Sequence, residues 1–194
     1  MKTDIILSGV GGQGILSIAA AIGEAALKEG LYMKQAEVHG MSQRGGDVQS
    51  NLRLSDRPIA SDLIPLGHAD LIISLEPMDS LRYLPYLNKE GWLVTNSQPF
   101  INIPNYPDLE KVKAELDKLP HKVVLDVEAI AKEAGSMRAA NIVMLGAATP
   151  FLGIEYEKIE DGVRSIFARK GEEIVAMNLK ALKAGYELAQ KHNQ

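Results

Sequence analysis

The sequence of 194 residues contains no cysteine. Because iron–sulfur clusters are held almost entirely by cysteine thiolates, the chain has no ligands for such a cluster. Disulfide bonds and thiol nucleophiles are excluded for the same reason. The four histidines are not spaced as metal ligands, and neither the H-E-x-x-H nor the G-x-S-x-G motif occurs. We therefore predict neither a catalytic residue nor a metal site on this chain.

Long apolar runs and charge of one sign are also scarce. No stretch approaches the roughly 18 uninterrupted apolar residues that a membrane-spanning helix needs, and the N-terminus lacks the pattern of a signal peptide. The formal net charge is −4, with both signs interspersed, and no basic run alternates with aromatic residues. We expect a cytoplasmic protein that binds neither a membrane nor nucleic acid.

Short apolar runs alternate with helical patterns along the first two thirds of the chain. The runs predict strands over residues 4–9, 32–39, 47–54, 69–75, 91–96 and 122–127. Helices are predicted over residues 15–28, 78–87, 109–119 and 128–134, and the chain from Arg138 onward is predicted to be helical throughout. This order predicts an α/β fold with three layers, α/β/α. The sheet is expected to be mostly parallel and to start like a Rossmann fold. One antiparallel hairpin is compatible with this pattern. A helical C-terminal tail is expected to follow the sheet.

The predicted strand over residues 47–54 alternates strictly between polar and apolar side chains. One face carries Val48, Leu52 and Leu54, and the other face carries Asp47, Gln49, Asn51 and Arg53. Such alternation indicates that one face is buried. The polar face is expected to meet water or a partner.

A glycine-dense turn, with the sequence GVGGQG, follows the first predicted strand. The G-x-G-x-x-G spacing of dinucleotide-binding turns is matched by Gly9, Gly11 and Gly14. Glu37 lies near the distance at which such folds place an acid for the ribose, but the second strand continues past it. Gly12 and Gln13 are not part of that fingerprint. Three interpretations stay open: a nucleotide site, a tight strand–helix turn, and a loop that meets a ligand or partner.

A second glycine-rich turn, HGMSQRGGD, occupies residues 39–47. Gly45 and Gly46 suit a hairpin bend. A plain hairpin seldom needs the polar residues that precede them, Ser42, Gln43 and Arg44. Arginine on an exposed bend is a natural clamp for phosphate or carboxylate. A plain turn and a functional loop both remain open.

A third polar stretch, EPMDSLR, begins where the predicted strand over residues 69–75 ends. Glu76 and Asp79 near a helix start are mostly explained by capping and by the helix dipole. Arg82 is expected to lie on a solvated helix face.

Three segments together resemble a known family: GVGGQGIL near the N-terminus, EVHGMSQRGGDVQSNLRLSD at residues 37–56 and ADLIISLEPMDSLRYLPYL at residues 69–87. They resemble the gamma-type domain of 2-oxoacid:ferredoxin oxidoreductases. The likeness extends through GWLVTNSQPF and AANIVMLGA and covers nearly the whole chain. It is specific because two glycine motifs occur in the right order and spacing. The resemblance implies one gamma-type domain over residues 1–194.

The likeness is to the small (beta) subunit of the indolepyruvate branch. This implies a supporting role in the oxidation of an arylpyruvate with coenzyme A and oxidised ferredoxin, which yields an acyl-CoA, carbon dioxide and reduced ferredoxin. The resemblance further implies that thiamine diphosphate, magnesium and the iron–sulfur clusters lie on a large (alpha) subunit. The thiamine diphosphate signature Gly-Asp-Gly is absent here, since residues 45–47 read Gly-Gly-Asp. The chain is therefore not expected to be active alone, and it would reach ferredoxin only through the complex.

The resemblance also implies a role for both glycine loops, which would face the large subunit and border the entrance for coenzyme A or the substrate. The residues carried over are Gly9, Gly11, Gly12, Gln13, Gly14, Ser42, Gln43, Arg44, Gly45 and Gly46. Two alternatives are a stand-alone Rossmann-like nucleotide-binding protein and a scaffold whose glycine loops only pack. The missing cysteines and the missing second domain argue against the stand-alone protein.

Overall fold

The computed structural model describes residues 1–39 and 45–192, which form a mixed sheet in the strand order β2-β3-β1-β4-β5-β6. The strands of this part of the chain are β1 (Lys2–Val10), β2 (Tyr32–His39), β3 (Asp47–Ser55), β4 (Ala69–Ser74), β5 (Leu87–Asn96) and β6 (Lys122–Leu125). The helices are α1 (Ile15–Lys28), α2 (Pro77–Arg82), α3 (Leu109–Asp117), α4 (Val127–Ala134), α5 (Ala140–Ala148), α6 (Tyr156–Phe167) and α7 (Glu172–His192).

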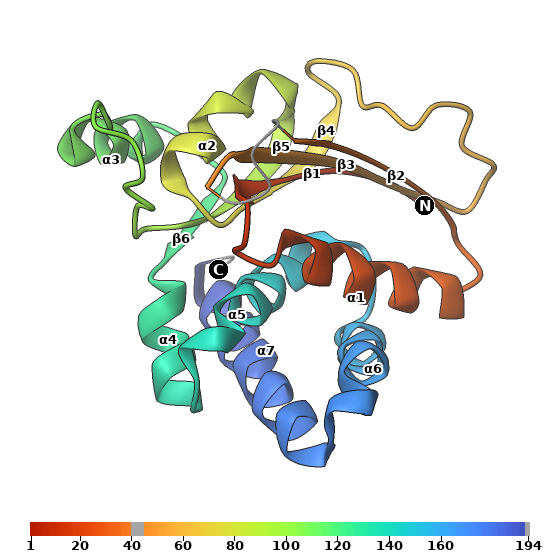
Figure 1. Cartoon of the computed structure of the whole chain (residues 1–194). Coiled ribbons are helices and arrows are strands. Elements are labelled where there is room, and N and C mark those ends of the chain that lie inside the picture. Colours follow the sequence, from red (N-terminus) through yellow and green to blue (C-terminus); the bar gives the residue numbers. More distant parts are fainter. Residues whose placement is uncertain (40–44, 193–194) are drawn as a thin grey trace.

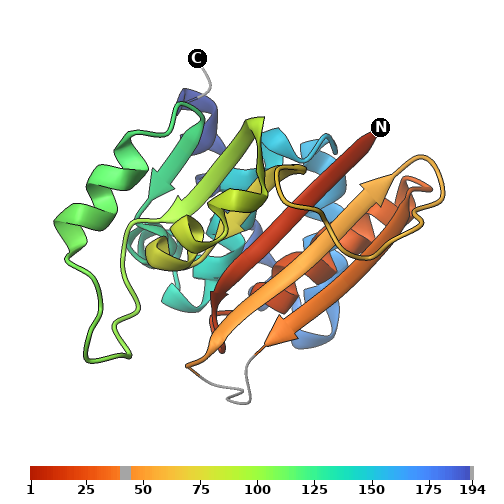
Figure 2. The same ribbon diagram turned by 90° about the horizontal axis from the view of Figure 1, so that it is seen from above.

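The direction of β3 distinguishes this sheet from a dinucleotide-binding sheet. β1, β4, β5 and β6 pair in parallel, whereas β3 runs antiparallel to both of its neighbours, β1 and β2. The predicted hairpin is therefore present as β2–β3, and its second strand also inserts beside β1. Figure 2 shows β1 (red) at the centre with β3 and then β2 (orange) on one side. The second strand in sequence is consequently one strand further from β1 than in a Rossmann fold.

Helices cover both faces of the sheet, which confirms the three layers. Figure 1 shows α2 and α3 on one face, and α1, α4, α5, α6 and α7 on the other. Each face of the sheet packs into its own hydrophobic core. Successive residues of β1 point into these two cores alternately, because side chains alternate across a strand. Ile5 and Leu7 belong to the larger core with α1 and α5, whereas Ile6 packs with Val112 and Leu116 of α3. The helical tail predicted from the sequence thus supplies most of one layer.

Two predicted boundaries were wrong around α2 and β5. The helix expected over residues 78–87 ends at Arg82, a 3₁₀ turn spans Leu84–Tyr86, and β5 already begins at Leu87. Pro85 accounts for the early end, because its ring lacks a donor and clashes with the preceding turn of a helix. Helix α5 is apolar on all sides, and its residues from Ile142 to Ala148 are buried.

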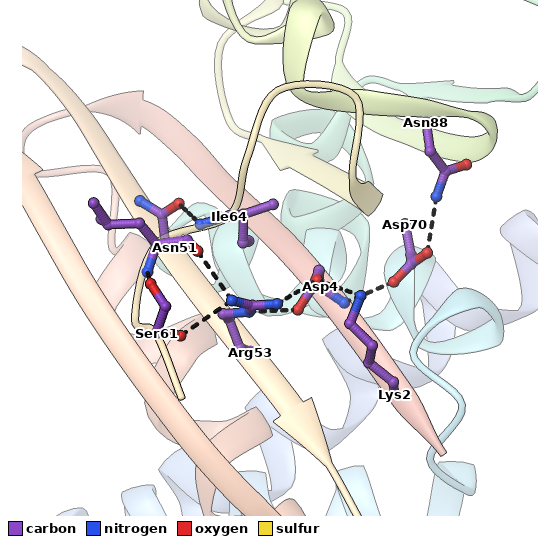
Figure 3. Close-up of polar contacts among 9 residues, drawn as sticks. Lys2, Asp4, Asn51, Arg53, Ser61, Ile64, Asp70 and Asn88 are labelled. Carbon is purple, nitrogen blue, oxygen red and sulfur yellow. Dashed lines mark hydrogen bonds and ion pairs between the residues drawn. The ribbon is translucent and has the colours of Figure 1, made fainter. Parts of the chain in front are cut away.

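The polar face of β3 is covered by the chain itself at Asn51 and Arg53, so the expectation that it meets water or a partner was wrong for these two residues. Asp47 and Gln49 on the same face are partly exposed. Residues 56–68 fold back over it (Figure 3). Asn51 is 3% exposed, and its Oδ1 accepts a hydrogen bond from the backbone N–H of Ile64 at 3.1 Å. Arg53 donates to two carbonyls of the same segment, those of Ser61 and Leu63. Strand periodicity reports burial only within one strand, and this cover comes from the connection to β4.

Arg53 also neutralises an acid at the centre of the sheet. Asp4 on β1 is 1% exposed, and its two carboxylate oxygens accept bonds from Nε and Nη2 of Arg53 at 2.7 and 2.9 Å. Lys2 Nζ lies 2.8 Å from the same carboxylate. Burial raises the pKa of Asp4, but the hydrogen bonds from Arg53 and Lys2 outweigh it and hold the pKa below its usual value of 3.8. Figure 3 shows the network continuing through Asp70 to Asn88.

Two glycines allow α5 and α7 to cross with their backbones in contact. A Cβ added at Gly146 would lie 2.0 Å from the carbonyl oxygen of Leu182, and one added at Gly185 would lie 2.0 Å from that of Val143. Both distances are far below van der Waals contact. This crossing therefore depends on hydrogen as the side chain at both positions.

Candidate functional site

The first glycine turn lies between the carboxyl end of β1 and the start of α1. Gly14 caps α1 with φ +89°, and an added Cβ there would lie 2.6 Å from the side-chain nitrogen of Asn141. Gly12 has φ +105° but no atom within 4 Å of such a Cβ. Gly14 is thus explained by local packing, whereas the backbone at Gly12 borders open space.

Gln13 is held inside this turn. Its Oε1 accepts a hydrogen bond from the N–H of Val10 at 2.7 Å, and its Nε2 donates to the carbonyl of Leu75 at 3.1 Å. The side chain therefore ties the ends of β1 and β4 together. These bonds give Gln13 a structural role beside the contact expected from the sequence.

Replacing Gln13 by alanine is expected to destabilise the chain by about 1–3 kcal/mol. The partly buried N–H of Val10 loses its bond to Gln13, and the carbonyl of Leu75 keeps only the longer bond from Asn96 at 3.4 Å. Urea denaturation of the purified chain measures this. Gln190→Ala is the matched control, since the side chain of Gln190 is exposed and donates to the hydroxyl of Tyr186 on the same helix, α7. Equal stability of the two variants would contradict a structural role for Gln13.

The two glycine loops meet, as expected for loops at one sheet edge. The N–H of Gly11 donates to the carbonyl of Gly46 at 2.8 Å, and the N–H of Gly45 donates to the carbonyl of Gly11 at 3.2 Å. Ser42, Gln43 and Arg44 lie outside the residues that the structure describes. Among the described residues, the predicted site therefore comprises the first turn together with Gly45 and Gly46.

A pocket of about 380 Å³ opens beside the first turn. It is lined by Val10, Gly11, Gly12, Gly14, Ile15, Leu16, Glu37, His39 and Val48. Glu37 thus faces the turn from β2, although β3 lies between them. α1 begins without a side-chain cap and without an acid in its first turn, so its first N–H groups favour an anion. Leu16, 57% exposed, adds an apolar surface.

A cluster of polar side chains lies beside this site, where β3 begins and α2 starts. It consists of Asp47, Glu76, Asp79 and Tyr83 and is here called the second polar group. Glu76 caps α2 through a hydrogen bond from the N–H of Asp79 at 2.8 Å, which confirms the capping predicted for it. Tyr83 donates to Asp47 at 2.6 Å. Burial, followed by the charges of Asp47 and Glu76, raises the pKa of Asp79 to about 6. A capping role for Asp79 does not predict its raised pKa, because one of the charges responsible, that of Asp47, lies on a different element, β3.

Two negative findings concern the described part of the chain. Residues 1–39 and 45–192 contain no group of three or more His, Cys, Asp or Glu side chains placed to hold a metal ion. Within the same ranges, none of the helices combines the length and apolar character needed to cross a membrane.

The family follows from a match over almost the whole chain. The model of the family described as pyruvate ferredoxin/flavodoxin oxidoreductase matches residues 4–188. The chain belongs to this oxidoreductase family. The gamma-type resemblance inferred from the two glycine motifs is thereby confirmed.

Individual members of the family support the same assignment. The indolepyruvate oxidoreductase subunit IorB of Archaeoglobus fulgidus is 38% identical over 97% of this chain and 96% of its own. The gamma subunit of a keto/oxoacid ferredoxin oxidoreductase from Geobacter sulfurreducens has a TM-score of 0.70 at 27% identity, covering 97% of this chain and 99% of its own.

A longer chain contains the same fold. The 2-oxoglutarate:ferredoxin oxidoreductase of Magnetococcus marinus, solved with 2-oxoglutarate, coenzyme A and succinyl-CoA bound, aligns with a TM-score of 0.77 at 22% identity. It covers 98% of this chain but only 31% of its own. This chain therefore spans about a third of that protein. The family match and the 38% identical subunit support an oxidoreductase subunit and give no support to a stand-alone nucleotide-binding protein.

Proposed function

We propose that the chain is the small subunit of an indolepyruvate:ferredoxin oxidoreductase. In that complex it supports the coenzyme A-dependent oxidative decarboxylation of arylpyruvates to an acyl-CoA, carbon dioxide and reduced ferredoxin. The observation that carries the proposal is the 38% identity to an indolepyruvate oxidoreductase subunit of matching length. In this proposal residues 1–194 act as a single gamma-type domain.

The redox chemistry is assigned to a large partner subunit. A chain without cysteine offers no thiolates to an iron–sulfur cluster, and its residues 45–47 depart from the thiamine diphosphate signature. We therefore place thiamine diphosphate, magnesium and the clusters on that partner, which also transfers electrons to ferredoxin. This chain completes the assembly and binds no cofactor of its own.

The pocket beside the first glycine turn is the proposed contact of this chain with coenzyme A or the large subunit. Three features support it: the uncapped start of α1, the open space above Gly12 and the exposed apolar side chain of Leu16. Backbone N–H groups at a helix start suit the phosphates of coenzyme A. Leu16 suits an apolar surface of the partner.

Co-expression with the candidate large subunit tests the assignment. The purified complex is expected to reduce ferredoxin or a viologen dye when given indolepyruvate and coenzyme A, and each chain alone is expected to be inactive. Pyruvate and 2-oxoglutarate serve as comparison substrates. Faster reduction with either of these than with indolepyruvate would overturn the assignment to arylpyruvates. Failure of the two chains to copurify would overturn the subunit role.

Gly12→Ala tests the pocket. Alanine at φ +105° strains the turn by about 1–3 kcal/mol and adds a methyl group to the open space. We expect either a KM for coenzyme A raised about tenfold in an intact complex, or assembly weakened by a similar factor. The first result identifies a coenzyme A contact, and the second identifies a partner contact.

Gly171→Ala is the matched control, because Gly171 also has a positive φ (+97°) and nothing within 4 Å, but lies at the start of α7. It likewise places alanine at a positive φ, but away from the pocket. If Gly12→Ala matches this control in both assembly and KM, the glycine turn only packs.

A further inference from the structure

Residues 98–106, here called the strap, cross from β5 towards α3 and pass over the second polar group. The N–H of Phe100 donates to Glu76 Oε1 at 3.3 Å, and the hydroxyl of Tyr106 donates to the same oxygen. Between these two points Ile101 is 63% exposed. Figure 2 shows this segment, in green, extending beyond the ends of the strands before it enters α3. The carboxylate of Glu76 therefore holds the strap at two points, Phe100 and Tyr106, on either side of an exposed stretch.

The strap is also bonded to the glycine loops. The side-chain amide of Asn102 donates to the carbonyl of Gly45, and the N–H of Gly45 donates to the carbonyl of Gly11. A continuous chain of hydrogen bonds thus runs from Glu76 through the strap to the first glycine turn. Movement of the strap away from Glu76 would remove a support from that turn.

Beneath the strap is a small cavity that carries excess negative charge. It measures about 90 Å³ and is bordered by three carboxylates and a single guanidinium, those of Asp47, Glu76, Asp79 and Arg82. Glu76 and Asp79 are 1% and 2% exposed. One oxygen of Asp47, Oδ1, is buried without a hydrogen-bond partner among the described residues. The uncharged hydroxyls of Tyr83 and Tyr106 are the other titratable groups facing the cluster, bonded to Asp47 and Glu76 respectively.

We propose that the strap is a lid whose closure depends on the charge of the carboxylates beneath it. When all three are ionised, burial and their repulsion outweigh the ion pair that Arg82 makes with Asp79 at 3.3 Å. This favours opening, because an open strap admits water to the carboxylates. When Asp79 is protonated, the repulsion falls and the strap closes over Glu76. Closure holds Gly45 and Gly11 in place, so the cluster controls how firmly the two glycine loops are joined.

The direction of the pH effect follows from linkage. Burial and the neighbouring carboxylates raise the pKa of Asp79 to about 6 when the strap is closed, and hydration on opening returns it towards its usual value of 3.8. The closed state therefore binds the proton more tightly, and closure weakens as the pH rises through this window. Between pH 5 and pH 7.5 the equilibrium constant for opening is expected to rise up to about tenfold.

Amide hydrogen exchange in the full chain, followed by NMR and corrected for intrinsic rates, tests this. Protection of the Phe100 and Gly45 amides is expected to fall up to about tenfold between pH 5 and pH 7.5. Asp79→Asn, which stays neutral, should keep both amides protected at pH 7.5. Asp161→Asn on α6 is the control and should behave as the wild type. Protection independent of pH, or unchanged by Asp79→Asn, would overturn the proposal.

A second variant tests the fastening itself. Tyr106→Phe removes one of the two bonds to Glu76 and should expose the Phe100 and Gly45 amides already at pH 5, while amides in β4 stay protected. Tyr32→Phe, on the edge strand and 51% exposed, is the matched control. If Tyr106→Phe exposes Phe100 but not Gly45, the strap opens without loosening the glycine loops, and that part of the proposal fails. The result does not depend on the large subunit or on the substrate.

Discussion

Gly146→Ala and Gly185→Ala are each expected to destabilise the chain by about 3 kcal/mol or more, at the upper end of the range for overpacking. The added methyl group would lie 2.0 Å from a backbone carbonyl oxygen of the facing helix in both cases. A backbone carbonyl cannot rotate away as a side chain can. The helices α5 and α7 would have to separate, which opens contacts along the whole crossing.

Chemical denaturation with urea or guanidinium, followed by circular dichroism, measures the loss. Gly23→Ala is the matched control, because Gly23 also lies inside a helix and its added Cβ would meet Met33 Sδ at 2.8 Å. The end of a methionine side chain moves easily, and alanine favours a helix over glycine by roughly 0.5–1 kcal/mol. The control is therefore expected to stay within about 1 kcal/mol of the wild type. Similar losses at positions 23, 146 and 185 would contradict the close crossing.

Arg53→Ala is expected to cost about 3–5 kcal/mol, because it leaves the carboxylate of Asp4 buried without its main partner. The side chain of Asp4 is 1% exposed, and the remaining cation, Lys2, is half exposed. The substitution also removes the two bonds from Arg53 to the carbonyls of residues 61 and 63. Arg164→Ala, which breaks an exposed pair on α6, is the control and should cost less than about 1 kcal/mol.

The pH dependence separates the lost charge pair from lost packing. The folded pKa of Asp4 lies below 3.8, so its contribution to stability is present above that value and is lost as the pH falls through the folded pKa. In Arg53→Ala, burial instead raises the pKa of Asp4, and the variant loses stability as the pH rises above 3.8. The difference between the two proteins should therefore grow from acid towards neutral pH. A constant difference across this range would show that the charge pair contributes nothing.

The sequence predicted the strands and helices well where the pattern itself carries the information. Helix α1 begins and ends where it was predicted, at residues 15 and 28, and the largely apolar run at residues 69–75 forms the central parallel strand β4. The cover over the polar face of β3 could not be predicted in this way. It depends on where a connection of a dozen residues folds, and periodicity within one strand carries no information on that.

Part of the candidate site could likewise be predicted from the sequence, and part could not. That both glycine turns lie at one edge of the sheet was foreseeable, since each follows a strand, and the bonds between Gly11 and the second turn agree with it. The internal bonds of Gln13 and the cluster around Asp79 were not foreseeable. They join side chains and carbonyls from strands that are distant in sequence. The part played by the turns in contacting coenzyme A or a partner stays a prediction.

The position of β1 in the sheet has a consequence for biosynthesis. This strand leaves the ribosome before both of its neighbours, because Ile5 pairs with Leu52 on one side and with Leu71 on the other. At about 5–20 residues per second, its second neighbour follows several seconds later. During that time the apolar residues Ile5, Ile6 and Leu7 can gain only β3 as a neighbouring strand. Because β1 is made before both neighbours, we expect its apolar side chains to make the nascent chain prone to aggregate until β4 has followed.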